Sequence, residues 1–242
     1  FERHLKGWNT VKNALRNVRN NKELNGCVSD LFQDKDREYS CAYFAHDDRT
    51  LVEAQAAKKR HIASKLKLDR PGLEVLDIGC GWGGLALTLA KDYGATVVGI
   101  TLSKEQLEEA RRRVREEGLE GQVRFELMDY RNVRHQFDRV VSVGMFEHVG
   151  RAQFERYFRG IKDCLKLDGI ALVHSIGRTD GPGTTNAWLQ KYIFPGGYSP
   201  ALSETLAAVE RSGLWVTDCE ILRLHYAKTI VDLRTRFDVN RQ

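Results

Sequence analysis

Two acidic residues of this sequence stand beside apolar runs, where a carboxylate is costly to bury. Asp77 lies near the end of the run "LEVLDIG", and Glu147 follows "VVSVGMF" and precedes His148. Both runs are typical of buried strands, so both acids belong near the carboxyl ends of strands. A carboxylate in such a place can bind a cation, orient a base or accept a hydrogen bond from a reacting group. A structural alternative stays open, since an acid after a buried strand is often the cap of the next helix.

A glycine-rich turn follows Asp77. Residues 79–84 spell G-x-G-x-x-G between a predicted strand and a predicted helix, which fits a dinucleotide turn, a site for S-adenosylmethionine or simple strand–helix packing. Asp77 disfavours a nicotinamide dinucleotide, because an acid just before the turn repels a pyrophosphate held at the helix N-terminus. The ribose-binding acid expected after the second strand is also missing, since residues 101–103 read Thr-Leu-Ser and Glu105 falls in the next helix. The turn therefore favours a cationic cofactor such as S-adenosylmethionine.

A third acid, Asp129, follows the predicted strand "VRFELM". At the ligand-bearing edge of an open sheet it can accept a hydrogen bond from an adenine amino group. A turn or cap role explains Asp129 equally well. His148 is expected to point away from any site and to cap the next helix, because its neighbour Glu147 points inward.

The elements that position these residues alternate between helix and strand. Helices are expected at 50–68, 85–94, 103–118, 151–166 and 200–212, and strands at 73–79, 95–100, 123–128, 137–144, 169–176 and near 215–224. Strands separated by single helices imply parallel pairing with helices on both faces. The predicted fold class is therefore α/β, a Rossmann-like, mostly parallel, doubly wound sheet. The turn-rich stretch 178–198 is predicted to be an inserted cover over the sheet edge.

The predicted helix at 103–118 carries clear boundary signals. Ser103 and Gln106 fit a capping box, and Gly118 fits a C-terminal stop. Glu108 and Arg112, and likewise Glu109 and Arg113, are four residues apart, as in exposed ion pairs.

Length and composition fit one large globular domain. No apolar run approaches the eighteen or so residues of a membrane span. The five cysteines are scattered, with no C-x-x-C pair and no zinc-like His cluster. We therefore predict reduced thiols, no metal and a cytoplasmic location. No signal peptide is visible, although the chain begins with Phe1, so targeting stays open.

The excess positive charge is confined to the first 22 residues. The chain has a net charge of +5, and residues 1–22 hold six Lys and Arg against one Glu. Apolar residues recur there at helical spacing, so a basic amphipathic helix is predicted. Such a helix can lie on an anionic membrane surface or dock on the domain with its basic face in water.

Eight motifs in order resemble one family. They are "YSCAYF", "EAQAAKKRHI", "VLDIGCGWGGLA", "TLSKEQ", "DRVVSVGMFEHVG", "HSIGR", "YIFPGG" and "HYAKT". Together they are similar to the cyclopropane fatty acid synthases, relatives of the mycolic acid cyclopropane synthases. That resemblance implies an S-adenosylmethionine-dependent methyltransferase fold over 51–242, preceded by an N-terminal helical or lid segment at 1–50. It also implies action on unsaturated phospholipid acyl chains at the inner face of the membrane, without nucleic acid, and leaves a homodimer open.

The resemblance also assigns roles by position. Cofactor contacts are implied for Tyr39, Ser40, Asp77, Gly79, Gly81, Trp82, Gly83, Thr101, Leu102, Ser103, Gln106, Asp129 and Tyr130. A bicarbonate pocket is implied for Cys41, Glu147, His174 and Tyr226, with the main chain of Ile176. In the implied reaction, methyl transfer to the double bond leaves a carbocation, and bicarbonate removes the proton that lets the ring close. Cys41 then has a packing and pocket role, because no step needs a nucleophilic thiol.

Two departures from the family keep alternatives open. Residues 20–23 read Asn-Asn-Lys-Glu where the family usually has a His-His-Tyr-Asp-like run, and the chain stops at Gln242 without the C-terminal helices that help line an acyl tunnel. The resemblance would also include an N-terminal lipid-binding domain beyond the basic segment, and whether these departures are real losses or missing segments stays open. The alternatives are methylation without ring closure, giving a methyl-branched or methylated unsaturated chain, and a catalytically weak homologue that binds lipid or cofactor.

Overall fold

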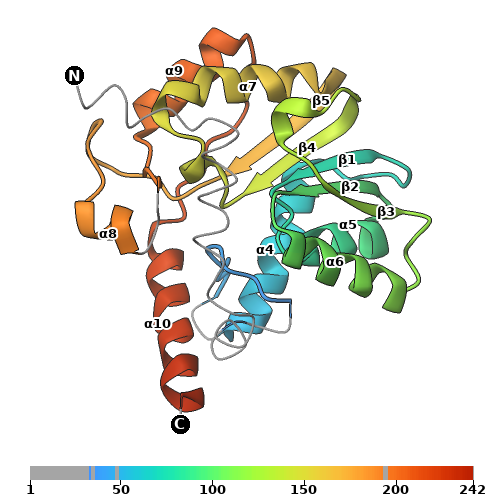
Figure 1. Cartoon of the computed structure of the whole chain (residues 1–242), viewed down its shortest axis with the longest axis horizontal. Coiled ribbons are helices and arrows are strands. Elements are labelled where there is room, and N and C mark those ends of the chain that lie inside the picture. Colours follow the sequence, from blue (N-terminus) through green and yellow to red (C-terminus); the bar gives the residue numbers. More distant parts are fainter. Residues whose placement is uncertain (1–32, 34–35, 47–48, 193–195, 242) are drawn as a thin grey trace.

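The computed structural model describes residue 33 and residues 36–46, 49–192 and 196–241 (Figure 1). The predicted basic helix at 1–22 and the departure at 20–23 lie outside these ranges.

Helices and strands alternate along most of the described chain. They are α4 (Leu51–Lys65), β1 (Glu74–Ile78), α5 (Gly84–Tyr93), β2 (Thr96–Thr101), α6 (Lys104–Glu116), β3 (Val123–Leu127), the 3-10 turn η1 (Tyr130–Asn132), β4 (Phe137–Val143), η2 (Phe146–His148), η3 (Arg151–Gln153), α7 (Phe154–Asp163), β5 (Leu165–His174), α8 (Ala187–Tyr192), α9 (Leu202–Ser212) and α10 (Arg223–Asn240). This order confirms the predicted alternation up to α9.

The five strands form one parallel sheet in the order β3-β2-β1-β4-β5. Chain order reverses between β1 and β4, which are direct neighbours in the sheet. In open α/β sheets, ligands bind outside the carboxyl ends of the strands at such a point. The glycine turn follows β1 and the stretch containing Glu147 follows β4, so the fold brings both predicted regions to this place.

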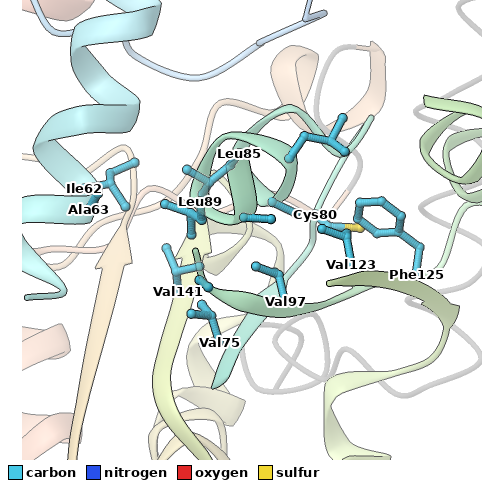
Figure 2. Packing of buried hydrophobic residues seen from close by; sticks show 14 of the residues in the cluster. Ile62, Ala63, Val75, Cys80, Leu85, Leu89, Val97, Val123, Phe125 and Val141 are labelled. Carbon is cyan, nitrogen blue, oxygen red and sulfur yellow. The ribbon is translucent and has the colours of Figure 1, made fainter. Parts of the chain in front are cut away.

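Alternate residues of each strand enter different hydrophobic clusters. Val75 and Val97 pack with α4, α5 and α6 on one face, whereas Leu76 and Val98 pack with α7 and α9 on the other. Figure 2 shows the first cluster, with Ile62 of α4 and Leu85 of α5 over the strands. Both faces are therefore covered, as the sequence predicted for a doubly wound sheet.

Local signals explain several helix boundaries. Thr50 and Glu53 form a reciprocal capping box at the start of α4. Gly94, at φ +65°, ends α5 in a left-handed conformation. Only one of the two hydrogen bonds of the capping box predicted at α6 forms. Ser103 accepts from the N–H of Gln106, but the Gln106 amide oxygen accepts from the Thr101 hydroxyl instead of reaching back to Ser103.

The strand predicted near 215–224 is also wrong. Residues 214–222 are irregular and α10 begins at Arg223. Trp215 is 92% exposed, and Asp218 and Glu220 pair with Lys65 of α4. The segment thus lies against α4 instead of joining the edge of β5. Helix α10 then extends away from the sheet (Figure 1).

Within 178–198, the predicted cover, the described residues contain the short helix α8. The last residue of this segment, Tyr198, lies close to the candidate site, because its N–H donates to the carbonyl of Glu147 at 2.9 Å. None of the helices in the described part of the chain is both long enough and apolar enough to cross a bilayer.

Candidate active site

The predicted site residues gather at the carboxyl edge of the sheet. Asp77 pairs in register with Gly99 of β2 and Val141 of β4, and Val143 of β4 pairs with His174, the last residue of β5. Parallel strands end at the same edge, so residues on and just after these strand ends become neighbours. Tertiary structure therefore unites positions that are up to a hundred residues apart.

The glycine turn lets the chain come close to its neighbours. Gly79 has φ +81°, and a Cβ there would lie 3.0 Å from the Cγ of Met145. Gly84 opens α5, and a Cβ there would lie 3.1 Å from Oε1 of Glu38. This third glycine therefore makes room for residues 36–38, a role that the sequence pattern did not reveal.

Asp77 is a buried acid without a full set of partners. It is 2% exposed, and its Oδ2 has no hydrogen-bond partner among the described residues. Burial, with a smaller contribution from Glu38, raises the pKa of Asp77 to about 7. Glu38 is itself paired with Lys58, so the unpartnered oxygen of Asp77 is the acceptor that remains where the sequence predicted a cationic cofactor.

Residues 36–44 form an irregular segment, the strap, which carries Tyr39, Ser40 and Cys41. Two buried lysines of α4 hold its first half. The ammonium group of Lys58 donates to Glu38 at 2.5 Å and to the Ser40 hydroxyl at 2.8 Å. The same helix contributes Gln55, whose amide donates to the carbonyl of Ser40 at 3.1 Å. The strap is therefore fixed beside the glycine turn.

A second ion-pair group joins the strap to α6. Asp36 accepts from Lys59 at 2.6 Å and from Arg113 at 2.6 Å. Arg113 also donates to the carbonyl of Trp82 in the glycine turn at 3.1 Å. The exposed Glu109–Arg113 pair predicted from the sequence is therefore wrong, because the folded chain brings Asp36 to Arg113. In its place, Glu109 pairs with Arg112, which also pairs with Glu116, so the predicted Glu108–Arg112 pair is wrong as well.

The end of β2 supplies a hydrogen-bonded polar group. Thr101, Ser103 and Gln106 are all buried, and the Thr101 hydroxyl joins the other two. Leu102 is half-buried between them. All lie beside the glycine turn, because the carbonyl of Ile100 accepts from the N–H groups of Gly79 and Cys80.

Asp129 has the cap role that the sequence left open. One oxygen accepts from the N–H and the Nε of Arg131, and the other accepts from a terminal nitrogen of Arg131 at 2.6 Å. Arg131 is thus the chief partner of this carboxylate, and an adenine contact stays a prediction. Tyr130 packs edge-on against the buried ring of Tyr157.

Only one of the two carboxylate oxygens of Glu147 has a hydrogen-bond partner among the described residues. Oε1 accepts from the main-chain N–H of Ile176 at 2.6 Å, whereas Oε2 is buried and has no partner among the described residues. The nearby Ser175 hydroxyl donates to the carbonyl of Ile176. Burial raises the pKa of Glu147, and hydrogen bonds from the N–H groups of Ile176 and Glu147 and from the Ser175 hydroxyl oppose that shift. The second oxygen can still accept a hydrogen bond.

His174 offers a second buried polar atom. Its Nδ1 has no partner among the described residues. Burial, with a smaller contribution from the ammonium group of Lys58, lowers the pKa of His174 to about 4. The imidazole is therefore neutral at physiological pH and has one ring N–H to donate.

Cys41 and Tyr226 complete the group. Burial raises the pKa of Tyr226, and Tyr39, Cys41 and Glu147 raise it as well because they lie nearby. Burial also raises the pKa of Cys41, against smaller effects of a hydrogen bond with the Thr229 side chain and of the charge of Lys58, so the thiol stays protonated. Cys41 and Glu147 are thus near enough to Tyr226, and Lys58 to Cys41 and His174, to shift the pKa values of these groups.

The side chains of Glu147, His174 and Tyr226 together offer both hydrogen-bond acceptors and donors. Glu147 Oε2 can accept from an ion's hydroxyl, and a neutral His174 and Tyr226 can donate to its oxygens. Among the described residues, no group of three or more His, Cys, Asp or Glu side chains could hold a metal ion. A separate pocket of about 400 Å³ between α7 and α9, around Arg151 and Glu204, contains none of the predicted site residues.

Sequence reasoning missed the residues that hold the strap. The position of Lys58 could have revealed its burial, because Lys58 lies on the same face of the helix as Ala54 and Ile62, both of which are buried in α4. A lysine there needs an acid from elsewhere. Its partner Glu38 had no such signal.

Comparison with known proteins identifies the family. The sequence profile described as mycolic acid cyclopropane synthetase matches residues 9–242. The chain belongs to this family. Its fold, a five-stranded parallel sheet with helices on both faces, also resembles that of a solved coclaurine N-methyltransferase, with a TM-score of 0.79 at 24% identity.

Individual relatives are similar over most of this chain. A Pseudomonas putida protein named "Probable fatty acid methyltransferase" is 44% identical over 86% of this chain and 54% of its own length. The cyclopropane-fatty-acyl-phospholipid synthase of Escherichia coli K12 is 46% identical over 75% of this chain and 47% of its own. The chain thus spans about half the length of these relatives.

A solved family member supports the fold. The crystal structure of mycolic acid cyclopropane synthase CmaA1, complexed with SAH and CTAB, has a TM-score of 0.86 and 32% identity, covering 94% of this chain and 84% of that one.

Proposed function

We propose that this protein transfers a one-carbon unit from S-adenosylmethionine to the cis double bond of an unsaturated phospholipid acyl chain and closes a cyclopropane ring. The observation that supports this most is Glu147, a buried carboxylate with one oxygen held by Ile176 and the other without a partner. Family membership supplies the reaction class. The phospholipid substrate and the bicarbonate are parts of the proposal.

The cofactor end of the site is built to hold a positive charge. When bound, S-adenosylmethionine supplies an electrophilic methyl group on a sulfonium. Asp77 is the acid that would hold the cationic cofactor, since it has an unpartnered oxygen. Tyr39 and Ser40 of the strap, the turn at Gly79–Gly83 and the polar group at Thr101–Gln106 would surround it. Asp129 and Tyr130 are the proposed adenine-side residues.

At the other end of the site, a proton has to be removed where water is excluded. Methyl transfer leaves positive charge on the acyl chain, and water there would give an alcohol instead of a ring. Bound bicarbonate would supply the base that removes a proton from the added methyl group. Glu147 would accept a hydrogen bond from the hydroxyl of the ion, while His174 and Tyr226 would donate hydrogen bonds to its other oxygens. The protonated Cys41 thiol would close the pocket.

Labelled cofactor tests this proposal directly. The protein is incubated with methyl-labelled S-adenosylmethionine and vesicles of cis-unsaturated phospholipid. We expect label in a ring methylene, located by proton spectra of the product. Label confined to a branched methyl group would reject ring closure and favour the second candidate.

That second candidate is methylation without ring closure. The P. putida relative, named as a fatty acid methyltransferase, favours it. Both reactions add one carbon, so product mass alone does not separate them. A third alternative, weak lipid or cofactor binding without turnover, predicts that Glu147→Gln changes nothing measurable.

We further propose that the protein acts at the inner face of an anionic membrane, through the basic segment 1–22. Its charge, six basic residues against one acid, motivates this. Co-sedimentation with anionic vesicles should fall when Lys12, Arg16 and Arg19 are replaced by Gln. Equal binding by both proteins would reject the membrane role. Homodimer formation is open to measurement by sedimentation.

A further inference from the structure

Helix α10 holds the second half of the strap through two side chains. The N–H of Ala42 donates to the hydroxyl oxygen of Thr229 at 3.0 Å, and the N–H of Phe44 donates to Nδ1 of His225 at 2.9 Å. The bonded residues are 187 and 181 positions apart in sequence. These bonds connect the segment that carries Cys41 to the helix that carries Tyr226.

The Thr229 hydroxyl is fully used. It is 1% exposed and donates to the carbonyl of His225 at 2.7 Å. Because a hydroxyl has one proton, its lone pairs face the N–H of Ala42. Valine has the same shape but no acceptor, so it would leave that buried N–H unpaired.

His225 can accept from Phe44 only while Nδ1 is unprotonated. Its ring stacks on Tyr43, with centroids 5.1 Å apart, and Tyr43 stacks on His61 of α4 at 4.2 Å. The charged or titratable groups around it are Lys228 on its own helix, Glu220 in the preceding segment and His61 on α4. Burial and Lys228 lower the pKa of His225, which favours the neutral, accepting ring.

The two halves of the strap are therefore held by different elements. Ion pairs to α4 and α6 hold residues 36–40, next to the glycine turn. Hydrogen bonds to α10 hold residues 42 and 44, and Leu233 of α10 packs against the apolar cluster that Ala42 and Phe44 form with two residues of α4. Loosening α10 should thus disturb Cys41 relative to Tyr226 without releasing the cofactor end.

We propose that Thr229 and His225 are positioning residues that set Cys41 and Tyr226 against each other across the pocket. This assignment rests on the proposed function, in which those two side chains line the anion pocket. Neither positioning residue needs to touch substrate or cofactor. Thr229 acts through the main chain at Ala42 and through its side-chain contact with Cys41, whereas His225 acts through the main chain at Phe44.

Thr229→Val tests the first bond, with Thr235→Val as the matched control. Thr235 lies on the same helix, and its hydroxyl donates to the carbonyl of Val231 at 2.9 Å, in an exposed place away from the strap. We expect Thr229→Val to speed amide exchange of residue 42 and to lower kcat by roughly tenfold or more, with cofactor Kd little changed. Thr229→Ser should restore both. Wild-type exchange and turnover in Thr229→Val, or equal loss in Thr235→Val, would overturn the proposal.

His225 gives an independent test that does not depend on turnover. Asparagine can place an acceptor near the Nδ1 position but does not titrate, whereas phenylalanine keeps the ring without an acceptor. We expect exchange of the Phe44 amide, corrected for its intrinsic rate, to accelerate on acidification in the wild type, to be independent of pH in His225→Asn and to be fast throughout in His225→Phe. The same pH dependence in the wild type and His225→Asn would refute the proposal.

These measurements also separate the two proposals. Exchange at residues 42 and 44 reports the bonds even if no ring product forms, in which case the proposed function fails alone. If product forms normally while the Thr229 and His225 variants exchange and turn over like the wild type, the positioning role fails alone.

Discussion

The main-chain N–H of Ile176 donates to Oε1 of Glu147 at 2.6 Å, and Oε2 of the same buried carboxylate has no partner among the described residues. The bond fixes the side chain in place but uses only one of its two oxygens. Because β4 and β5 are parallel neighbours, the chain that leaves β5 passes the acid that follows β4. A structural cap would use its oxygens on nearby N–H groups, whereas here one oxygen is left for a ligand.

Glu147→Gln should abolish turnover. The amide oxygen can still accept from Ile176, but the NH₂ group replaces the acceptor that a bicarbonate hydroxyl needs. We expect kcat to fall by about 10²–10⁴-fold. Cofactor affinity, measured by calorimetry, should be unchanged. Glu105→Gln, an exposed acid in α6, is the control. A Glu147→Gln protein with normal kcat would remove Glu147 from the mechanism.

Asp77 should link cofactor affinity to pH. Its pKa of about 7 in the ligand-free protein means that it is largely protonated below that pH, so binding of a cationic cofactor should weaken as pH falls from 8 to 6. Asp77→Asn should bind the cofactor more weakly at pH 8 and lose this pH dependence. Asp92→Asn, an exposed acid of α5, should behave like the wild type. Equal pH slopes in both variants would contradict the assignment.

Asp77 should also make the stability of the cofactor-free protein depend on pH, in the opposite direction. Raising the pH strengthens cofactor binding but lowers the free energy of unfolding. A carboxyl whose pKa is raised on folding penalises the folded state as pH rises from about 4 to about 7, by an amount on the order of 4 kcal/mol when complete. Without cofactor, Asp77→Asn should therefore be more stable than the wild type at pH 8 and about equal at pH 4. Urea unfolding at the two pH values measures this. A variant that is less stable at pH 8 would show that Asp77 is a structural hydrogen-bonding residue.

Lys59→Met should weaken cofactor binding from a distance. Burial alone would raise the pKa of Asp36, but Lys59 and Arg113 together lower it below its ordinary value, so Asp36 is held as an anion. Removing Lys59 takes away one of its two cations, and the strap should move away from the glycine turn. We expect the cofactor Kd to rise by about tenfold. Lys91→Met removes a lysine that is 65% exposed and 3.6 Å from Glu117, and should change Kd little. A similar Kd in both variants would mean that the ion pairs do not position the strap.

His174 should titrate far below an ordinary histidine. Its pKa of about 4 predicts that its ring resonances shift only near that pH, instead of near 6.5. A base whose pKa is lowered on folding destabilises the folded state as pH falls from 6.5 to 4, so His174→Gln should lessen acid unfolding over that range. NMR titration, with His174→Gln to assign the signal, measures the pKa. A midpoint near 6.5 would show that the imidazole is hydrated and not part of a dry pocket.

The sequence by itself determined the local structure and the list of chemical groups. Period-2 and period-3.6 apolar patterns, the Gly94 stop and the G-x-G-x-x-G turn predicted every strand of the observed sheet and the helices from α4 to α9, apart from the short α8. Such signals are local, because side-chain direction repeats with the backbone. The motif series predicted the family, which the comparison confirmed. The prediction of an additional strand near 215–224 is wrong, because an apolar pattern does not reveal whether a segment will pair with a sheet edge or pack against a helix.

Only the tertiary structure decided which groups meet. Lys58 with Glu38, Arg113 with Asp36, and Thr229 with Ala42 are pairs from distant parts of the chain. No sequence spacing specifies them, because each depends on how three helices lie around one irregular segment. The same packing sets the state of the acids. Asp77 and Glu147 have raised pKa values because the fold buries them, and Asp129 is an ion-paired cap because Arg131 folds back onto it.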